Sequence, residues 1–405
     1  MTQSIINKYF HILFIFSLIF SILLYKSIGF DYMDELCALT LFILFFYVMA
    51  KTPDWTINKA FLMTLAVFVF YTVYSLWIGS NTPRGIINDL AIQIKPYLGF
   101  FCVYQLKPVF DEKQKKLLKE ISLFFWILFL LPLGILSLVS MDVLFIVMEH
   151  PVYYGIAVVI VALCYLYCSE FTKRNKMIFL VLLVIGLFCS RSKFYGFYAL
   201  AIFMVLFFSN IKQFKLNFRN ILIILCMLAV IIVVAWQKIS LYFFQVLTNE
   251  VDEDLIARFV LYRNAPDILR DYFPFGSGFA SYATFSSGLY YSDIYIKYGI
   301  EYVWGLSKSY HGFISDTYYP SLAQFGVAGI ALYLLFWGYI VRKTYVFYLK
   351  SRDTKSLIII LMIVGFLAIE GTTGSTFIAQ GGFFVMMMMG LILSGMSQEQ
   401  QIEKK

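Results

Sequence analysis

Long runs of apolar residues, separated by short polar connections, fill most of the chain. A run of about 20 apolar residues is long enough to cross a bilayer as an α-helix. On this criterion we expect about twelve transmembrane helices, at residues 9–25, 34–50, 60–79, 87–106, 118–139, 152–169, 177–190, 194–209, 220–236, 318–341, 356–371 and 376–396. The pattern therefore predicts an all-α polytopic membrane protein.

One long stretch, residues 237–317, lies between the ninth and tenth expected helices. Lysines and arginines gather in alternate connections, and basic residues collect on the cytoplasmic side of a membrane. This rule places both termini in the cytoplasm and the long loop in the periplasm of a bacterial inner membrane. The predicted organisation is nine helices in 1–236, an external loop at 237–317, three helices in 318–396 and a cytoplasmic tail at 397–405.

The composition agrees with a membrane protein, since the chain is 61% hydrophobic and only 14% charged. The net charge of +8 is spread over short loops, where the orientation rule explains it, so nucleic-acid binding is not expected. The six cysteines fall in or beside apolar runs and form no CxxC pair, which argues against a disulfide framework or a zinc site. Asp252 and Asp254 form a literal Asp-x-Asp, but acids at a helix start explain them more simply.

The stretch "CSRSKFYGF" (189–197) places two cations between apolar runs, in a short turn on the external side. Arg191 and Lys193 could reach the lipid headgroups as isolated long side chains do. Alternatively they form an anion site, because a guanidinium binds phosphate oxygens through two parallel hydrogen bonds. Hydroxyls of Ser190 and Ser192 and the backbone N–H groups at the start of the next helix would add donors.

Two charged residues lie inside the expected helix at 87–106. Asp89 and Lys95 each cost about 2.5–3.5 kcal/mol in a bilayer on insertion scales, so we expect both to face the interior of the bundle. Arg84, just outside this helix, would join the external basic cluster.

The external loop has three features of its own. The stretch "ARFVLYRNAPDILRDY" predicts an amphipathic helix with Arg258 on one stripe and Arg263 on another, and "PFGSGF" (274–279) ends it. A tyrosine-rich part follows, whose rings could stack on sugars or lie at the membrane interface; the candidates for acceptor glycan binding are Tyr290, Tyr291, Tyr295 and Tyr310. His311 and Asp316 precede the tenth helix as candidate proton-transfer groups.

Four short segments carry a resemblance to a known family. These are "LFCSRSKFYGFYAL", "ARFVLYRNAPDILRDYFPFGSGF", "SDTYYPSLAQFGVAGI" and "EHPVYYGIAVV". Their order and their shared external side resemble the O-antigen polymerase and O-antigen ligase superfamily. The resemblance places Arg191 on the arginine of the family's external turn and Arg258 on its loop arginine.

The resemblance implies a membrane glycosyltransferase whose donor is an oligosaccharide on a polyprenyl diphosphate, usually undecaprenyl diphosphate. Arg191 and Arg258 would bind the donor diphosphate with Lys193, Arg263 and Arg84 in support, and His311 or Asp316 would activate the acceptor hydroxyl. No metal ion or other cofactor would be required, because arginines neutralise the leaving group. Membrane lipid, a chain-length regulator and a flippase are the further expected partners.

Asp316 lies ten residues before Gly326, close to where the family's ligases typically place a His-Asn pair, whereas His311 lies fifteen residues before it. This departure favours a polymerase over a ligase. Two alternatives stay open: an O-antigen ligase acting on lipid A core, and a lipid-oligosaccharide flippase or other transporter.

Overall fold

The structure, a computed structural model, describes residues 2–25, 32–52, 57–208 and 257–402. These residues form α-helices with short 3-10 and π segments, and no strand occurs among them. Eight helical segments in these ranges are long and apolar enough to cross a membrane: Gln3–Leu23, Met33–Lys51, Lys59–Ile78, Pro83–Leu106, Glu112–Ser137, Pro151–Cys168, Tyr318–Ser351 and Gln380–Gln398. The expected all-α membrane fold is confirmed, but the expected number of helices is not. The helix expected at 220–236 lies outside the described residues.

Two expected spans are shorter α-helices in the structure, α10 (Lys173–Val184) and α11 (Ser192–Ile202), whereas α18 (Thr354–Glu370) nearly coincides with the span expected at 356–371. The tenth expected span begins at Tyr318 as expected, in the short α16 (Tyr318–Ser321) and a 3-10 turn, but α17 (Gly326–Ser351) continues it beyond the apolar run. Backbone hydrogen bonding does not stop at the last apolar residue, and long cationic side chains there can reach back toward the polar layer.

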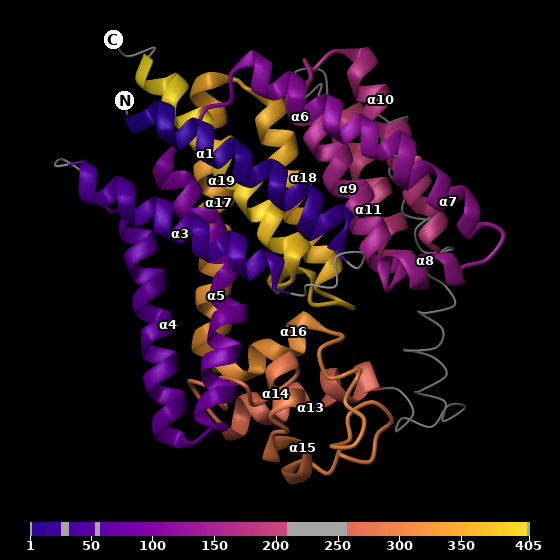
Figure 1. The fold of residues 1–405 in the computed structure, drawn as a ribbon. Helices are drawn as coiled ribbons and strands as arrows, with labels where there is room; N and C mark the ends of the chain where they lie inside the picture. The colour runs from indigo at the N-terminus through magenta and orange to yellow at the C-terminus, as the bar shows by residue number, and fades with distance from the viewer. Residues whose placement is uncertain (1, 26–31, 53–56, 209–256, 403–405) are drawn as a thin grey trace, which may run out of the picture.

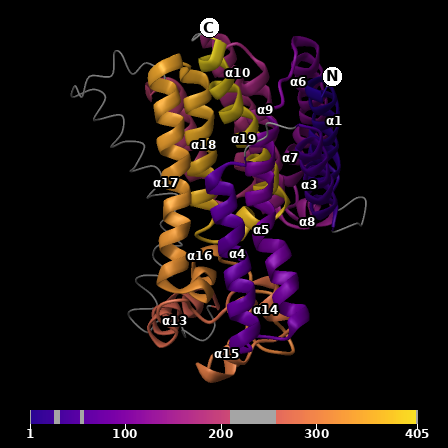
Figure 2. The ribbon, with the colours of Figure 1, turned by 90° about the vertical axis from the view of Figure 1, so that its left-hand side faces the viewer.

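The centre of the bundle is α19 (Gln380–Ile402), which packs against α5 (Pro83–Leu106), α17, α18 and α9 (Pro151–Cys168) (Figures 1 and 2). Glycines allow α5 and α19 to approach closely. A Cβ at Gly390 would lie 2.6 Å from the carbonyl oxygen of Phe100, and one at Gly99 would lie 3.0 Å from the ring of Phe383. These helices form the rigid part of the molecule against which the outer segment is built.

The outer segment, residues 257–317, lies at the end of the molecule opposite to both termini (Figure 1). It contains α13 (Ala257–Asp271), α14 (Phe285–Leu289) and α15 (Asp293–Lys297). It has an apolar core of its own, which includes Leu261, Ile268, Tyr282, Tyr295 and Leu306. The acidic stretch that precedes α13 in the sequence lies outside the described residues.

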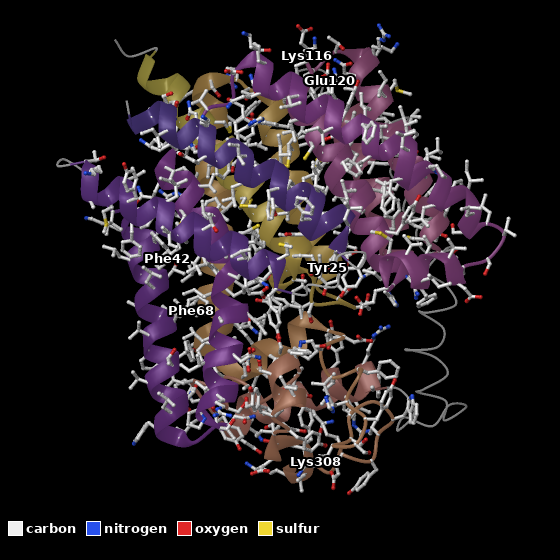
Figure 3. The ribbon with its side chains drawn as sticks, viewed as in Figure 1. Tyr25, Phe42, Phe68, Lys116, Glu120 and Lys308 are labelled. Atoms are coloured by element: carbon white, nitrogen blue, oxygen red, sulfur yellow. The ribbon has the colours of Figure 1, made fainter. Side chains whose placement is uncertain are left out.

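The two ends of the molecule are polar, while aromatic and aliphatic side chains fill the zone between them. Lys116 and Glu120 lie at the end that carries the termini and Lys308 at the other end, with Phe42 and Phe68 between them (Figure 3). This distribution is that of a protein whose middle is surrounded by lipid.

The "PFGSGF" turn docks onto the start of α17. Gly276 adopts φ 80°, and a Cβ there would lie 2.2 Å from the backbone nitrogen of Gly326, so only glycine fits. The N–H of Gly278 donates to the carbonyl of Gln324 at 2.8 Å, and the N–H of Ala328 donates to that of Pro274 at 3.1 Å. The turn thereby fixes the outer segment to the bundle.

The hairpin of α4 (Lys59–Ile78) and α5 holds the outer segment from the other side. Asp89 is fully buried, and its Oδ2 accepts the N–H of Ala280 at 2.8 Å. Lys95 is also buried, where it pairs with Asp34 and Glu35 of α3 (Met33–Lys51). Both charged residues of the expected fourth helix therefore face the interior, as the cost of exposing them to lipid predicts.

Candidate active site

The turn between α10 and α11 carries the first candidate arginine. Ser190 ends the preceding 3-10 turn in the left-handed conformation at φ 52°, and Arg191 is the N-cap residue of α11. Its half-buried guanidinium places Nη2 3.4 Å from Nε2 of His150. Burial lowers the pKa of Arg191 from its usual value, yet an arginine stays charged at any physiological pH.

His150 is the N-cap residue of α9, and its Nδ1 accepts the N–H of Val152 at 3.2 Å. The neutral ring therefore carries its proton on Nε2. Burial, and after it the charge of Arg191, lowers the pKa of His150 to about 4, so the ring is neutral at pH 7. The Nε2–H of His150 and the guanidinium of Arg191 are two donors side by side, an arrangement that favours an anion between them.

The loop arginine meets the predicted acid. Nη2 of Arg258, in the first turn of α13, lies 2.6 Å from Oδ2 of Asp316. After Arg191, the charges that act on the pKa of His150 are those of Asp316, Lys193 and Arg258. We call these five residues, His150, Arg191, Lys193, Arg258 and Asp316, the outer charge cluster.

Lys193 is placed differently from the two arginines. Its Nζ lies 2.6 Å from Oε2 of Glu370, the last residue of α18, and both side chains are nearly inaccessible to solvent. Oε2 of Glu370 also accepts the hydroxyl of Thr376 at 2.8 Å. The ammonium of Lys193 is thus already neutralised inside the protein.

The turn that follows Glu370 contacts both other parts of the cluster. The carbonyl of Gly371 accepts the N–H of Tyr318 at 3.2 Å, and that of Thr372 accepts the hydroxyl of Tyr262, on α13, at 2.8 Å. The hydroxyl of Ser375 donates to the carbonyl of Ser315. The turn therefore holds the segment around Asp316 and the helix that carries Arg258.

A comparison with known families finds one match to the chain. The family model described as Wzy_C, O-antigen ligase, matches residues 177–334. This part of the chain is similar to the O-antigen ligase family. A search of curated proteins finds no match to the chain.

The Wzy_C match confirms the resemblance to the O-antigen polymerase and ligase superfamily and includes three of the four segments that carry it. It covers Arg191, Arg258 and Asp316, whereas His150 and Glu370 lie outside it. Sequence reasoning missed these two as site residues. Two features of the sequence could have identified them. His150 lies in "EHPVYYGIAVV", one of the segments that carry the resemblance, and Glu370 is the acid that follows the apolar run 357–369.

Three of the predicted site residues lie apart from the cluster. His311 is exposed, with its ring against Gly288 of α14, and Arg84 is exposed in the first turn of α5. Within the described parts of the chain, no contact joins either one to the outer charge cluster. Arg263 is exposed on α13, and a separation of five residues turns it to another face from Arg258. Their assigned roles stay predictions.

The four predicted glycan-binding tyrosines divide into two groups. Tyr295 is fully buried, and its hydroxyl accepts the N–H of Ala283 at 2.9 Å, so it cannot contact an external glycan. The hydroxyl of half-buried Tyr291 donates to the carbonyl of Leu306 at 2.8 Å, and Tyr290 is half-buried. The rings of Tyr295 and Tyr291 belong to the core of the outer segment, where tyrosine suits a small core because its hydroxyl finds a partner.

Tyr310 is the exposed exception. It is 41% exposed, and its ring centroid lies 4.6 Å from that of Trp304, which is 59% exposed. This pair presents an aromatic surface on the outer segment. Trp304 ends the tyrosine-rich stretch but was not among the predicted residues, although its size and its place in the stretch could have identified it.

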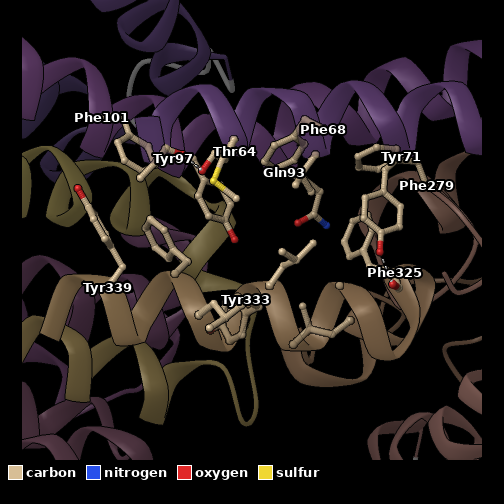
Figure 4. A pocket seen from close by; sticks show the side chains of 18 of the residues that line it. Thr64, Phe68, Tyr71, Gln93, Tyr97, Phe101, Phe279, Phe325, Tyr333 and Tyr339 are labelled. Atoms are coloured by element: carbon tan, nitrogen blue, oxygen red, sulfur yellow. Dashed lines mark hydrogen bonds between the residues drawn. The ribbon is translucent and has the colours of Figure 1, made fainter. Parts of the chain in front are cut away.

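An apolar slot lies beside the outer segment, between α4 and α17 and lined also by α5 (Figure 4). Its volume is about 230 Å³, and most of its lining is aromatic. The hydroxyl of Tyr71 donates to the carbonyl of Phe325 at 2.6 Å at one end, and the amide of Asn58 donates to the hydroxyl of Tyr339 at 3.1 Å at the other. The slot has the chemistry of a site for a hydrocarbon chain.

Proposed function

We propose that the protein is a surface-polysaccharide polymerase, O-antigen polymerase in type. It joins oligosaccharide repeat units carried on polyprenyl diphosphate, usually undecaprenyl diphosphate, at the outer face of the bacterial inner membrane. The observation that carries this proposal is the meeting of Arg258 with Asp316 beside Arg191 and His150. Residues from four distant parts of a Wzy_C protein come together there.

The donor diphosphate is an anion that needs cations and hydrogen-bond donors at the membrane surface. Arg191 and Arg258 supply guanidinium groups, and the Nε2–H of His150 supplies a neutral donor beside the first of them. Charge-assisted hydrogen bonds from arginine to phosphate are among the strongest in proteins. The cluster therefore supports binding of a diphosphate without a metal ion.

The reaction breaks the bond between the anomeric carbon of the donor sugar and the diphosphate oxygen. The bond that forms joins this carbon to the acceptor hydroxyl oxygen, whose proton passes to a base. Asp316 suits this role because its carboxylate is about one third exposed and lies in the cluster. The diphosphate departs on its lipid, and the two arginines stabilise the negative charge that grows on its oxygen.

Two other features support the assignment of substrates. The exposed pair of Trp304 and Tyr310 offers aromatic faces to an acceptor glycan. The apolar slot between α4 and α17 offers a place for the hydrocarbon chain of the carrier lipid.

O-antigen ligase is the second candidate, because the matching family model carries that description. A ligase would use the same donor and would differ in its acceptor, which is lipid A core. The position of Asp316, ten residues before Gly326, favours the polymerase.

The test uses purified protein in nanodiscs with lipid-linked repeat units as the only substrate. A polymerase gives a ladder of longer lipid-linked glycans, and EDTA leaves the ladder unchanged. Transfer only after addition of lipid A core would identify a ligase, and movement across the bilayer without elongation would identify a transporter. Inhibition by EDTA would contradict the metal-free step.

A further inference from the structure

The ion pair of Lys193 and Glu370 is nearly inaccessible to solvent. The two side chains are 9% and 6% exposed, and Thr376 donates a second hydrogen bond to the carboxylate. A Cβ at Gly374 would lie 2.8 Å from Nζ of Lys193, so the turn packs closely against the ammonium. In this geometry the ammonium cannot reach a diphosphate in the cluster.

The pair joins two elements that carry the donor-binding groups. Lys193 lies in the first turn of α11, two residues after Arg191. Glu370 ends α18 and is followed by the turn that bonds to the backbone beside Asp316 and to Tyr262, four residues after Arg258 on α13. One described chain of contacts between the elements that carry the two arginines therefore passes through this ion pair.

We propose that Lys193 and Glu370 are positioning residues that set the distance between the guanidinium groups of Arg191 and Arg258. The inference rests on the proposed function, since it assumes that these arginines bind one diphosphate. A diphosphate gains most when both guanidinium groups already stand at the right distance, because preorganised charges need not rearrange during the reaction. The pair acts through the arginines and does not touch the substrate.

A simple electrostatic role makes the opposite prediction for one variant. If Lys193 mattered only through its charge, Glu370→Gln would expose the diphosphate to an uncompensated ammonium and tighten its binding. If the pair sets geometry, Glu370→Gln and Lys193→Met both weaken binding, although they change the net charge in opposite directions. The sign for Glu370→Gln therefore separates the two roles.

The experiment measures binding of undecaprenyl diphosphate to purified protein in nanodiscs. We expect Kd to rise roughly tenfold in Glu370→Gln and in Lys193→Met, at unchanged binding stoichiometry, which corresponds to about 1.4 kcal/mol. The charge swap Lys193→Glu with Glu370→Lys restores the link and returns Kd to within about threefold of the original value. A loss of folded protein alone would lower the stoichiometry and leave Kd unchanged.

The matched control is Lys355→Met. It removes a half-buried cation at the start of α18, the helix that ends at Glu370, where Nζ of Lys355 donates to the carbonyls of Tyr167 and Ser169. It should leave Kd unchanged. Tighter binding in Glu370→Gln, or a Kd no higher than in the control, would overturn the inference. If the charge swap does not fold, the double variant Lys193→Met with Glu370→Leu replaces it. This variant removes the ion pair without changing the net charge, so an unaltered Kd would also contradict the positioning role.

Failure of the proposed function looks different. If Arg191→Ala leaves the Kd for undecaprenyl diphosphate unchanged, the donor site itself is wrong. If Arg191→Ala weakens binding and Glu370→Gln does not, only the positioning role is wrong.

Discussion

Two ion pairs lie where the bundle meets the outer segment, and they differ in exposure. In the pair of Arg258 and Asp316 the side chains are 32% and 30% exposed, whereas in the pair of Lys193 and Glu370 they are 9% and 6% exposed. The distance between nitrogen and oxygen is 2.6 Å in both. Contact distance therefore does not distinguish the roles of the two pairs, whereas their access to solvent and substrate does.

The difference follows from the physics of charges near a surface. A partly exposed pair contributes little to stability, about 0–1 kcal/mol, so Arg258 can exchange Asp316 for a phosphate at small cost. A buried pair cannot be opened cheaply, because either charge alone would be stranded away from water. The first pair is suited to bind and react, and the second to hold the structure.

The largest effect should be on stability. Glu370→Ala strands the ammonium of Lys193 and should lower the free energy of unfolding by about 3–5 kcal/mol, whereas Asp316→Ala should lower it by less than about 1 kcal/mol. Thermal unfolding of the purified variants in one detergent measures both. Equal losses of unfolding free energy in the two variants would mean that the two ion pairs contribute equally to stability.

For activity, the exposed pair and its neighbour Arg191 should matter more than the buried pair. Arg258→Ala and Arg191→Ala each remove a group that stabilises the leaving diphosphate and should lower kcat by about 10²–10³-fold, with protein levels near normal. The length of polymer on the cell surface and the rate in nanodiscs check this. Full-length polymer in either variant would contradict the donor-site assignment.

The sequence predicted much of this arrangement and could not predict the rest. Apolar runs and charged turns predicted the helices and placed Arg191, Arg258 and Asp316 on one side. They gave no means of predicting that Lys193 is buried while Arg191, two residues away, is only half-buried, because burial depends on which helix packs opposite each side chain. Glu370 lies 177 residues from its partner, and nothing local links the two. The burial of Tyr295 was out of reach for the same reason, because a tyrosine-rich stretch does not show which rings fill a core.

A smaller loss should follow when the charge of Arg191 is kept and its shape is changed. Arg191→Lys retains a cation but loses the planar fork, so kcat/KM for the donor should fall roughly tenfold. Lys193→Arg serves as the comparison, because a buried ammonium fitted against Gly374 leaves little room for a guanidinium. This variant should affect stability more than the reaction. Full activity of Arg191→Lys would mean that Arg191 only reaches the lipid headgroups.

The exposed aromatic pair should have a weaker effect, confined to the acceptor. Trp304→Ala removes one face of a surface that lies away from the buried core and should raise the KM for the acceptor about threefold at unchanged kcat. Tyr295→Phe is the contrasting variant, since its ring is buried and only its hydroxyl is lost. It should leave this KM unchanged. A change in donor KM upon Trp304→Ala would place the pair elsewhere in the reaction.

The smallest effect concerns pH and tests whether His150 acts as a donor and not as a base. Burial and the charge of Arg191 lower the pKa of His150 to about 4, so the ring is neutral above about pH 5 and gains a proton only below that range. Replacing His150 should therefore not alter the shape of the kcat/KM profile over a usual assay range of about pH 5.5 to 8. His150→Gln keeps an N–H near the position of Nε2 and should retain more activity than His150→Ala, by a few-fold. Loss of a titration near pH 6 in His150→Gln would contradict this account, because it would mean that the imidazole exchanges its proton during the reaction.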